Sequence, residues 1–197
     1  VWNTATWTQV RTLTGGHDAD VANNAISALV ATPDSKTLVS SAGDATIIVW
    51  DLATGQPRHK INLQPTAALS LCLSPPDAPT RIIAGCHDGT IRGFRLADGT
   101  LVGSFGDAGK INNTHTGYIT GVAVQPDGKI LATGFIDNDS FRVSRYDDDG
   151  TLEANNSYQL GYSADYTDND RAVGLFVHDD GDIVVAGTRD VDEDQGQ

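Results

Sequence analysis

A histidine, a serine and an aspartate near the start of the chain are of the types that hydrolases combine for nucleophilic catalysis. They are His17, Ser40 and Asp44. An imidazole can take up a serine proton, and a carboxylate can hold the imidazole in place. The same groups also suit a structural role, because a buried carboxylate needs donors such as an imidazole and an indole N–H, here that of Trp50. We expect the structural role and name no catalytic residue.

Clusters of aspartates in the second half could offer oxygen ligands to a calcium ion. The tightest is the turn formed by Asp147, Asp148 and Asp149, and two more lie at 137–139 and 165–170. None follows the calcium-loop pattern that ends in a glutamate at its twelfth position. Solvated turns explain the clusters better, and no two histidines have the spacing of zinc ligands. We therefore expect no metal and no other cofactor. If a calcium ion did bind, Asp147, Asp148 and Asp149 would be its candidate ligands.

Three glycosylation sequons begin at Asn112, Asn138 and Asn155, all in the second half of the chain. They matter only in an exported protein. Their shared position in expected loops favours an extracellular or cell-surface location over the cytoplasm, although the compartment stays open.

A polar stretch at 153–171 contains three tyrosines, Tyr158, Tyr162 and Tyr166. Rigid aromatic side chains are frequent anchors of interfaces, and long loops on rigid scaffolds often carry function. We therefore expect a binding loop there. The alternative is that these rings pack between neighbouring structural units.

The charge of the chain excludes some classes of partner. Residues 1–100 carry 8 acidic and 7 basic side chains, a net −1, and residues 101–197 carry 18 and 6, a net −12. Phosphate backbones need a surface of lysine and arginine, so a nucleic acid is not expected. No apolar run approaches the roughly 20 residues of a membrane helix, so membrane insertion is not expected either.

Turn residues recur at a spacing of 43–53 residues. The strand-ending aspartates are Asp34, Asp77, Asp127 and Asp180 in one series and Asp44, Asp88, Asp139 and Asp190 in another. Short apolar runs between them predict four strands per unit. The expected strands are 25–30, 37–40, 46–50 and 57–63; then 69–73, 81–84, 90–95 and 100–105; then 119–124, 129–133, 141–146 and 151–159; then 172–177 and 183–186. Four strands per unit of this length predict an all-β propeller of four-stranded antiparallel blades.

The first unit resembles the WD-repeat family. It contains Gly16-His17, then 38–44 (LVSSAGD), and ends with Trp50-Asp51. The resemblance is best over residues 1–105 and implies that His17, Ser40, Asp44 and Trp50 form one hydrogen-bonded network. Phe94 stands at the tryptophan position of the second unit, which puts a complete network there in doubt. The second half, from 121 onward, resembles bacterial delta-sixty propeller repeats.

The ends of the chain align with the interior of a blade. Residues 1–6 match 49–54 at a constant offset of 48. We therefore expect one propeller domain or segment at 1–190, with a half-blade at 1–14, blades at 15–64, 65–110 and 111–160, a half-blade at 171–190 and an acidic tail at 191–197. A segment of a larger propeller is favoured. Closure of a four-bladed ring and a ring of two chains are the alternatives.

The expected function follows from the fold and from the lack of a catalytic set. We expect a non-catalytic scaffold that binds other proteins through its loop faces. One alternative is an extracellular or surface component that assembles with copies of itself. The remaining alternative is a propeller hydrolase or lyase, which would use residues lining a central channel, and the sequence shows no polar cluster assignable to such a channel.

Overall fold

The computed structural model describes residues 1–18, 25–112, 115–136, 140–160, 171–178 and 180–188. All regular secondary structure in these residues is β-strand. The described part of the chain therefore holds no helix that could span a membrane.

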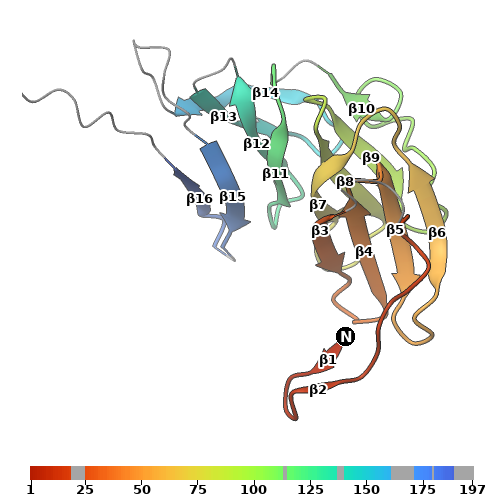
Figure 1. The fold of residues 1–197 in the computed structure, drawn as a ribbon. Helices are drawn as coiled ribbons and strands as arrows, with labels where there is room; N and C mark the ends of the chain where they lie inside the picture. The colour runs from red at the N-terminus through yellow and green to blue at the C-terminus, as the bar shows by residue number, and fades with distance from the viewer. Residues whose placement is uncertain (19–24, 113–114, 137–139, 161–170, 179, 189–197) are drawn as a thin grey trace, which may run out of the picture.

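Three four-stranded sheets make up most of the chain, and within each sheet strands that follow one another in the sequence lie side by side and antiparallel (Figure 1). The first is β3 (Ile26–Ala31), β4 (Thr37–Ala42), β5 (Thr46–Asp51) and β6 (Pro57–Asn62). The second is β7 (Ala68–Ser74), β8 (Arg81–Cys86), β9 (Ile91–Arg95) and β10 (Lys110–Ile111). The third is β11 (Ile119–Val124), β12 (Ile130–Ile136), β13 (Ser140–Tyr146) and β14 (Leu152–Leu160). We call these the first, second and third blades.

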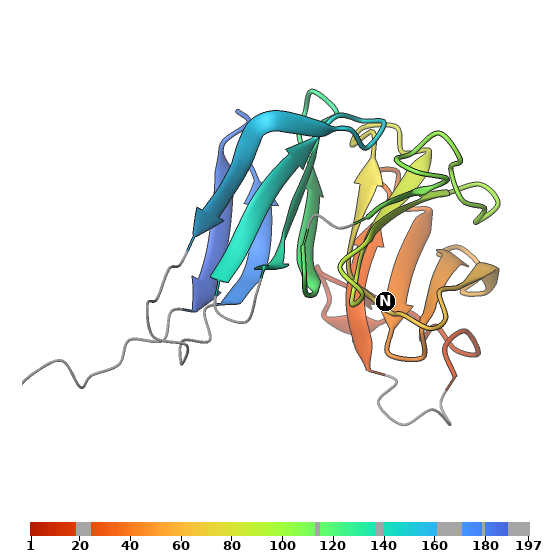
Figure 2. The ribbon, with the colours of Figure 1, turned by 90° about the horizontal axis from the view of Figure 1, so that it is seen from above.

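A two-stranded sheet lies on either side of this set. One pairs β1 (Trp2–Asn3) with β2 (Thr8–Gln9), and the other pairs β15 (Arg171–Val177) with β16 (Ile183–Thr188). The first strands β3, β7, β11 and β15 pack next to one another in that order, so the sheets fan out as neighbouring blades (Figure 2). The expected all-β propeller class, with four-stranded antiparallel blades, is confirmed.

The first strand of every unit contains a register shift at the same place. The shifts lie between Ile26 and Ala28, Ala68 and Ser70, Ile119 and Gly121, and Ala172 and Gly174. A bulge bends a strand and increases its twist. The repeated bulge gives each unit the same curvature and aligns the four units position by position.

Two apolar clusters fill the spaces between the three blades. The first lies between the first and second blades and includes Val39 and Ile47 on one side and Leu71 and Ile82 on the other. The second lies between the second and third blades and includes Phe105 and Ile119. Strands β4 and β5 are buried along nearly their whole length. In β5 this explains the continuous apolar run from Ile47 to Trp50, which is typical of a strand covered on both faces.

The fourth strand of the second blade differs from the sequence prediction. The expected strand at 100–105 is replaced by an isolated bridge from Leu101 to Phe94 and a turn, and β10 begins only at Lys110. Phe105 is fully buried in the second cluster, where it lies against Gly93. The chain therefore turns inward to bury this ring instead of running along the edge of the sheet.

The two half-units do not join in the structure. Among the described strands, β1–β2 and β15–β16 remain separate sheets, and three complete blades lie between them in the chain. The ring of four blades that closes within one chain is not formed in this arrangement.

Ile82 offers a test of the packing between blades, because its side chain is fully buried in the first cluster. We expect Ile82→Ala to lower the free energy of unfolding by about 2–5 kcal/mol, since it removes apolar contacts and leaves a cavity. Urea unfolding followed by tryptophan fluorescence measures this loss. Leu101→Ala, at a half-exposed position on the second blade, is the control and should change stability by no more than about 0.5 kcal/mol. Equal effects of the two substitutions would contradict the proposed core.

Candidate functional site

His17, Ser40, Asp44 and Trp50 meet at one edge of the first blade. Ser40 lies in β4, and Asp44 lies in the turn that connects β4 to β5. Trp50 lies near the end of β5, and His17 precedes β3. The indole Nε1–H of Trp50 donates to Ser40 Oγ at 2.8 Å, and Ser40 Oγ lies 2.7 Å from His17 Nε2. His17 Nδ1 lies 3.2 Å from Asp44 Oδ1. With its proton on Nδ1, the imidazole donates to the carboxylate and accepts from the serine hydroxyl, so every group in the chain has a partner.

The Asp44 carboxylate is fully enclosed and is surrounded by donors. The backbone N–H of Asp18 donates to Oδ2 at 2.8 Å, and the hydroxyl and backbone N–H of Thr46 donate to Oδ1 at 2.7 and 3.0 Å. Burial raises the pKa of Asp44, but the hydrogen bonds from Asp18, Thr46 and His17 outweigh it and hold the pKa below its usual value. The carboxylate is therefore ionised, and it ties the segment before β3 to the turn between β4 and β5.

Gly16 explains why the Trp50 ring can lie under this segment. A Cβ at position 16 would come within 2.3 Å of the indole ring. No larger residue fits there without displacing a buried ring, which gives the Gly16-His17 pair of the sequence a steric reason.

The order carboxylate, imidazole, hydroxyl is also that of a catalytic triad, so access decides between the two roles. Ser40 is only 2% exposed, and its Oγ already receives the indole N–H of Trp50. A nucleophile must reach a substrate carbonyl, and Ser40 is almost completely covered although it lies at the base of a surface cavity that His17 and Trp50 also line. The geometry supports a network that fastens the blade.

The second blade replaces this network with a smaller one. Asp88 accepts hydrogen bonds from the Thr90 hydroxyl at 2.6 Å and from Arg92 Nη2 at 2.7 Å. Burial raises the pKa of Asp88, while these contacts and the charge of Arg92 outweigh it and lower the pKa. Phe94 takes the position of the tryptophan, as the sequence indicates.

In the third blade, His115 is buried and lies 3.2 Å from the backbone oxygen of Arg142. Burial lowers its pKa to about 4, so the imidazole is neutral.

The calcium candidates are engaged in contacts within the protein. Asp147 forms an ion pair with Lys129 at 3.3 Å, and Asp148 lies 3.7 Å from Arg81. Asp149 accepts the backbone N–H of Thr151 at 2.8 Å, which closes the turn before β14. The structure thus gives these carboxylates ion-pair and turn roles. Among the residues it describes, no three His, Cys, Asp or Glu side chains come together as a metal site.

The expected binding loop differs from the structure where it can be compared. Tyr158 lies within β14, opposite Val143, so it belongs to a paired strand and not to a loop. Hydrogen bonding to β13 accounts for this, because the edge strand extends to Leu160. Tyr162 and Tyr166 lie outside the described residues.

The sequons are likewise only partly described. Asn112 follows β10 directly, and Asn155 lies within β14 and not in a loop. Asn138 lies outside the described residues.

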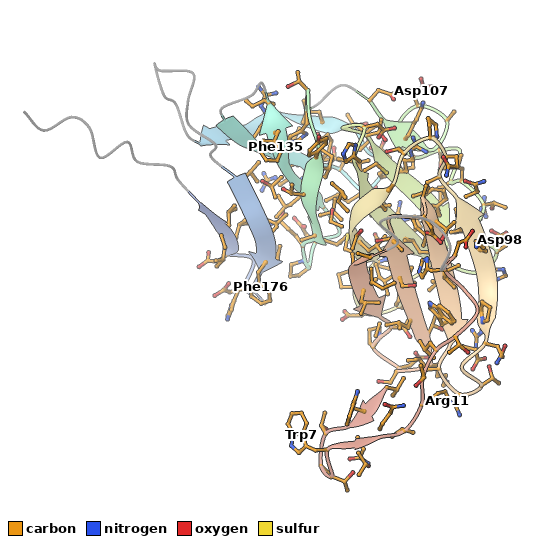
Figure 3. All side chains as sticks on the ribbon, viewed as in Figure 1. Trp7, Arg11, Asp98, Asp107, Phe135 and Phe176 are labelled. Carbon is orange, nitrogen blue, oxygen red and sulfur yellow. The ribbon has the colours of Figure 1, made fainter. Side chains whose placement is uncertain are left out.

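One cluster of rings was missed in the sequence. His87, in the turn after β8, stacks on Tyr118 with ring centroids 3.9 Å apart, and Tyr118 contacts Phe135 edge-on at 6.0 Å. We call these three residues the aromatic seam, because His87 comes from the second blade and the other two from the third. His87 is exposed and Tyr118 is 44% exposed. Figure 3 shows Phe135 at one end of the third blade, where the loops from neighbouring blades meet.

The sequence signal for the aromatic seam is the position of its residues at the ends of expected strands. Tyr118 precedes the first strand of its blade and Phe135 lies near the end of the second strand, and antiparallel pairing brings these two ends together. Two backbone hydrogen bonds, Gly117 N to Phe135 O and Phe135 N to Tyr118 O, hold them there.

Comparison with known proteins relates this geometry to a family. The WD40 model (WD domain, G-beta repeat) matches residues 7–51 and 108–143. Protein groucho of Drosophila melanogaster is 31% identical over 118 residues, 59% of this chain and 15% of that protein. Two solved structures, the WD40 repeats of RRP9 and U3-55K, each align with a TM-score of 0.62 at 18% identity, over 84% of this chain and 44% of theirs. These matches support the WD-repeat family. The chain spans less than half the length of any of these three proteins.

The two WD40 matches can be compared with the strands of the structure. The first contains all four residues of the network, and the second covers β10 to β12 and part of β13. The second match lies beyond residues 1–105, where the WD pattern is clearest in the sequence. The delta-sixty resemblance of the second half stays a prediction.

The WD-type network can be tested with two neighbouring serines. We expect Ser40→Ala to lower the free energy of unfolding by about 1–3 kcal/mol, because it leaves the buried indole N–H of Trp50 without an acceptor. Ser41→Ala is the matched control, since the Ser41 hydroxyl is equally buried but has no hydrogen-bond partner. Chemical unfolding of both variants measures the difference. A network without structural value would leave the two variants equally stable.

The lowered pKa of Asp44 predicts a pH dependence. Because the folded pKa lies below the unfolded value, the ionised carboxylate stabilises the fold above about pH 4, and this contribution is lost as the pH falls through the folded pKa. The stability difference between the wild type and Asp44→Asn should thus be largest near neutral pH and shrink toward pH 2. Unfolding midpoints at several pH values measure it. Ser41→Ala, which removes no titrating group, should show no such trend, and a constant Asp44→Asn difference would contradict the assignment.

Proposed function

We propose that the chain is a non-catalytic protein-interaction scaffold and that the aromatic seam of His87, Tyr118 and Phe135 is a docking surface. WD-type repeats point to protein binding in general. What carries the finer proposal is an exposed, stacked pair of rings fixed across two blades. Rigid aromatic side chains bury much area at a small entropic cost, so they are favoured at the centres of interfaces.

The position of the seam supports this role. His87 and Tyr118 belong to loops at one end of the blades and Phe135 to the adjoining end of β12, while the apolar clusters lie between the sheets. Tyr118 also rests on Phe135, which reduces the freedom that a partner would otherwise have to restrict. A surface ordered in this way loses less entropy on binding.

Charge and access argue against the other classes of function. A formal net charge of −13 opposes a polyphosphate partner, so we propose proteins and not nucleic acids. The enclosed Ser40 opposes a hydrolase built on the His17 network. No feature of the described residues favours an extracellular structural component. For the domain, we propose a single propeller segment over residues 1–190.

The docking surface is tested by affinity capture with three versions of the chain as bait. The wild type should retain a stoichiometric partner from an extract of the source organism. His87→Ala combined with Tyr118→Ala should reduce retention at least tenfold, since truncating interface anchors costs about 2 kcal/mol or more. The partner would then be produced alone and its affinity measured by calorimetry against the same three versions.

Trp7→Ala is the matched control, because Trp7 is also an exposed aromatic residue and lies on the distant β1–β2 turn (Figure 3). It should bind as the wild type does. Equal binding by all three versions would refute the aromatic seam as the docking surface. A chain that retained no stoichiometric partner would count against the scaffold itself.

A further inference from the structure

The junction between the first and second blades, both of which are complete, contains a cavity of about 290 Å³. We call it the inter-blade cavity. The first blade lines it through β4, β5 and β6, and the second blade lines it through the turn before β8 and the turn after β9. His87 follows β8 and the cavity residues at 79–80 precede it, so the cavity and the aromatic seam lie at opposite ends of the blades.

Between the second and third blades, a side chain bridges the corresponding space. Arg81, the first residue of β8, donates from Nη1 to the backbone oxygen of Asp148 at 2.6 Å, and its Nη2 lies 3.7 Å from the Asp148 carboxylate. By strand register, Thr37 holds the position of Arg81 in the first blade. Ala97 lies two residues before a turn glycine, as Asp148 does. Thr37 and Ala97 both line the inter-blade cavity, and they cannot form such an ion pair.

Arg58 supplies a positive charge to this cavity. Successive residues of β5 pair with His59 and Pro57, which leaves Arg58 between them as the extra residue of a bulge in β6. A bulge changes the direction of a side chain and is common beside functional sites. The bulge therefore accounts for an arginine on an outer strand that reaches the junction between two blades.

The guanidinium of Arg58 retains hydrogen-bond donors beside the cavity. Its Nε and Nη2 donate to Asp51 Oδ2 at 3.1 and 2.5 Å, which fixes its orientation. The hydrogen bond from Arg58 lowers the pKa of Asp51 to about 2, so the pair stays ionised over a wide pH range. Nη1 lies 3.5 Å from Thr37 Oγ1, well beyond the roughly 2.9 Å of an ordinary N–H···O bond. Nη1 can therefore donate to a further acceptor.

Two more donors line the same cavity, the imidazole of His59 and the hydroxyl of Thr80. In the part of the chain that the structure describes, neither side chain has a hydrogen-bond partner. Apolar side chains, including Pro79 and Leu96, form the rest of the wall. A cation, two neutral donors and an apolar wall suit a carboxylate that is carried on a short alkyl chain.

The size and the surrounding charge of the cavity are consistent with such a group. Pockets for drug-sized ligands usually have volumes of about 300–1,000 Å³, so this smaller cavity suits a single side chain. Residues 1–100, which include both blades of the junction up to the turn after β9, carry a net charge of only −1. The acidity of the second half, which would repel an anion, is thus not shared by this part of the chain.

We propose that the inter-blade cavity binds the carboxylate of an aspartate or glutamate side chain from a partner protein, with Arg58 as its main contact. Nη1 of Arg58 would donate to the carboxylate, and His59 and Thr80 would be further donors. The partner would then bridge two blades, as Arg81 does within the chain at the next junction. This site adds a second contact surface to the proposed scaffold and does not depend on the aromatic seam.

Titration of the ¹⁵N-labelled 197-residue chain with a blocked peptide, acetyl-Ala-Glu-Ala-amide, tests the site by nuclear magnetic resonance. We expect saturable shifts of the Thr80 and Ala97 amide signals. The matched peptide with glutamine in place of glutamate should bind at least tenfold more weakly, because it cannot form the charge-assisted hydrogen bond. Equal binding of the two peptides would overturn the proposal, as would the absence of saturable shifts up to about 20 mM peptide.

Substitutions locate the contact. Arg58→Gln should weaken binding of the glutamate peptide at least tenfold. Ala97→Asp should do the same, because it places a carboxylate of the chain itself in the cavity, whereas Ala97→Asn, of equal size and without charge, should bind as the wild type does. Equal binding by the two Ala97 variants would contradict the assignment even if Arg58→Gln failed to fold, and circular dichroism verifies folding.

The double variant His87→Ala with Tyr118→Ala separates this site from the aromatic seam. It should bind the glutamate peptide as the wild type does, since both substitutions lie at the other end of the blades. Weakened peptide binding in this folded variant would place the peptide on the aromatic seam and overturn the inter-blade site. Failure of the seam to capture a partner would leave the peptide result unchanged.

Discussion

Each blade of this protein is a sheet with two apolar faces, and only another blade can cover them. Ile82 and Val39 illustrate the two sides of this constraint, since they come from successive blades and share one cluster. A single sheet cannot bury the side chains on its own two faces. The repeated bulge in every first strand keeps the sheets in a constant orientation, so the same register positions meet at each junction. Stability therefore accumulates between units, as expected for repeat architectures.

The polar network of each blade depends on which aromatic residue is buried between the blades. Where Trp50 brings a buried N–H, Ser40 supplies the acceptor. In the second blade the tryptophan position holds Phe94, which has no donor, and the serine position holds Ala84. The paired replacement removes donor and acceptor together, and so leaves neither buried without a partner. The loss of the WD pattern in the second unit is thus a consistent change and not a broken network.

The strands of the blades could be predicted from the sequence, because turn residues and apolar runs are patterns of neighbouring residues. The expected strands at 46–50 and 119–124 correspond to β5 and β11. The fourth strand of the second blade could not be predicted, because Phe105 is buried in the second apolar cluster, whose other members come from strands of both the second and the third blade. Tyr158 belongs both to the expected strand at 151–159 and to the expected binding loop at 153–171, and the structure places it in the strand, which extends to Leu160. The aromatic seam depends on residues 31 positions apart in two blades, a relation visible only after the blades are aligned.

The location of the aromatic seam connects the packing between blades with the proposed docking surface. Its stacked rings come from successive blades, so their 3.9 Å separation holds only while the second apolar cluster fixes one blade against the other. A partner that contacts both rings would bind a geometry set by side chains it never touches. Conversely, a substitution deep between the blades would alter binding without contacting the partner, by changing the angle at which the rings are presented. In this fold the packing between blades and the proposed docking surface are therefore coupled, because the packing sets the relative positions of His87 and Tyr118.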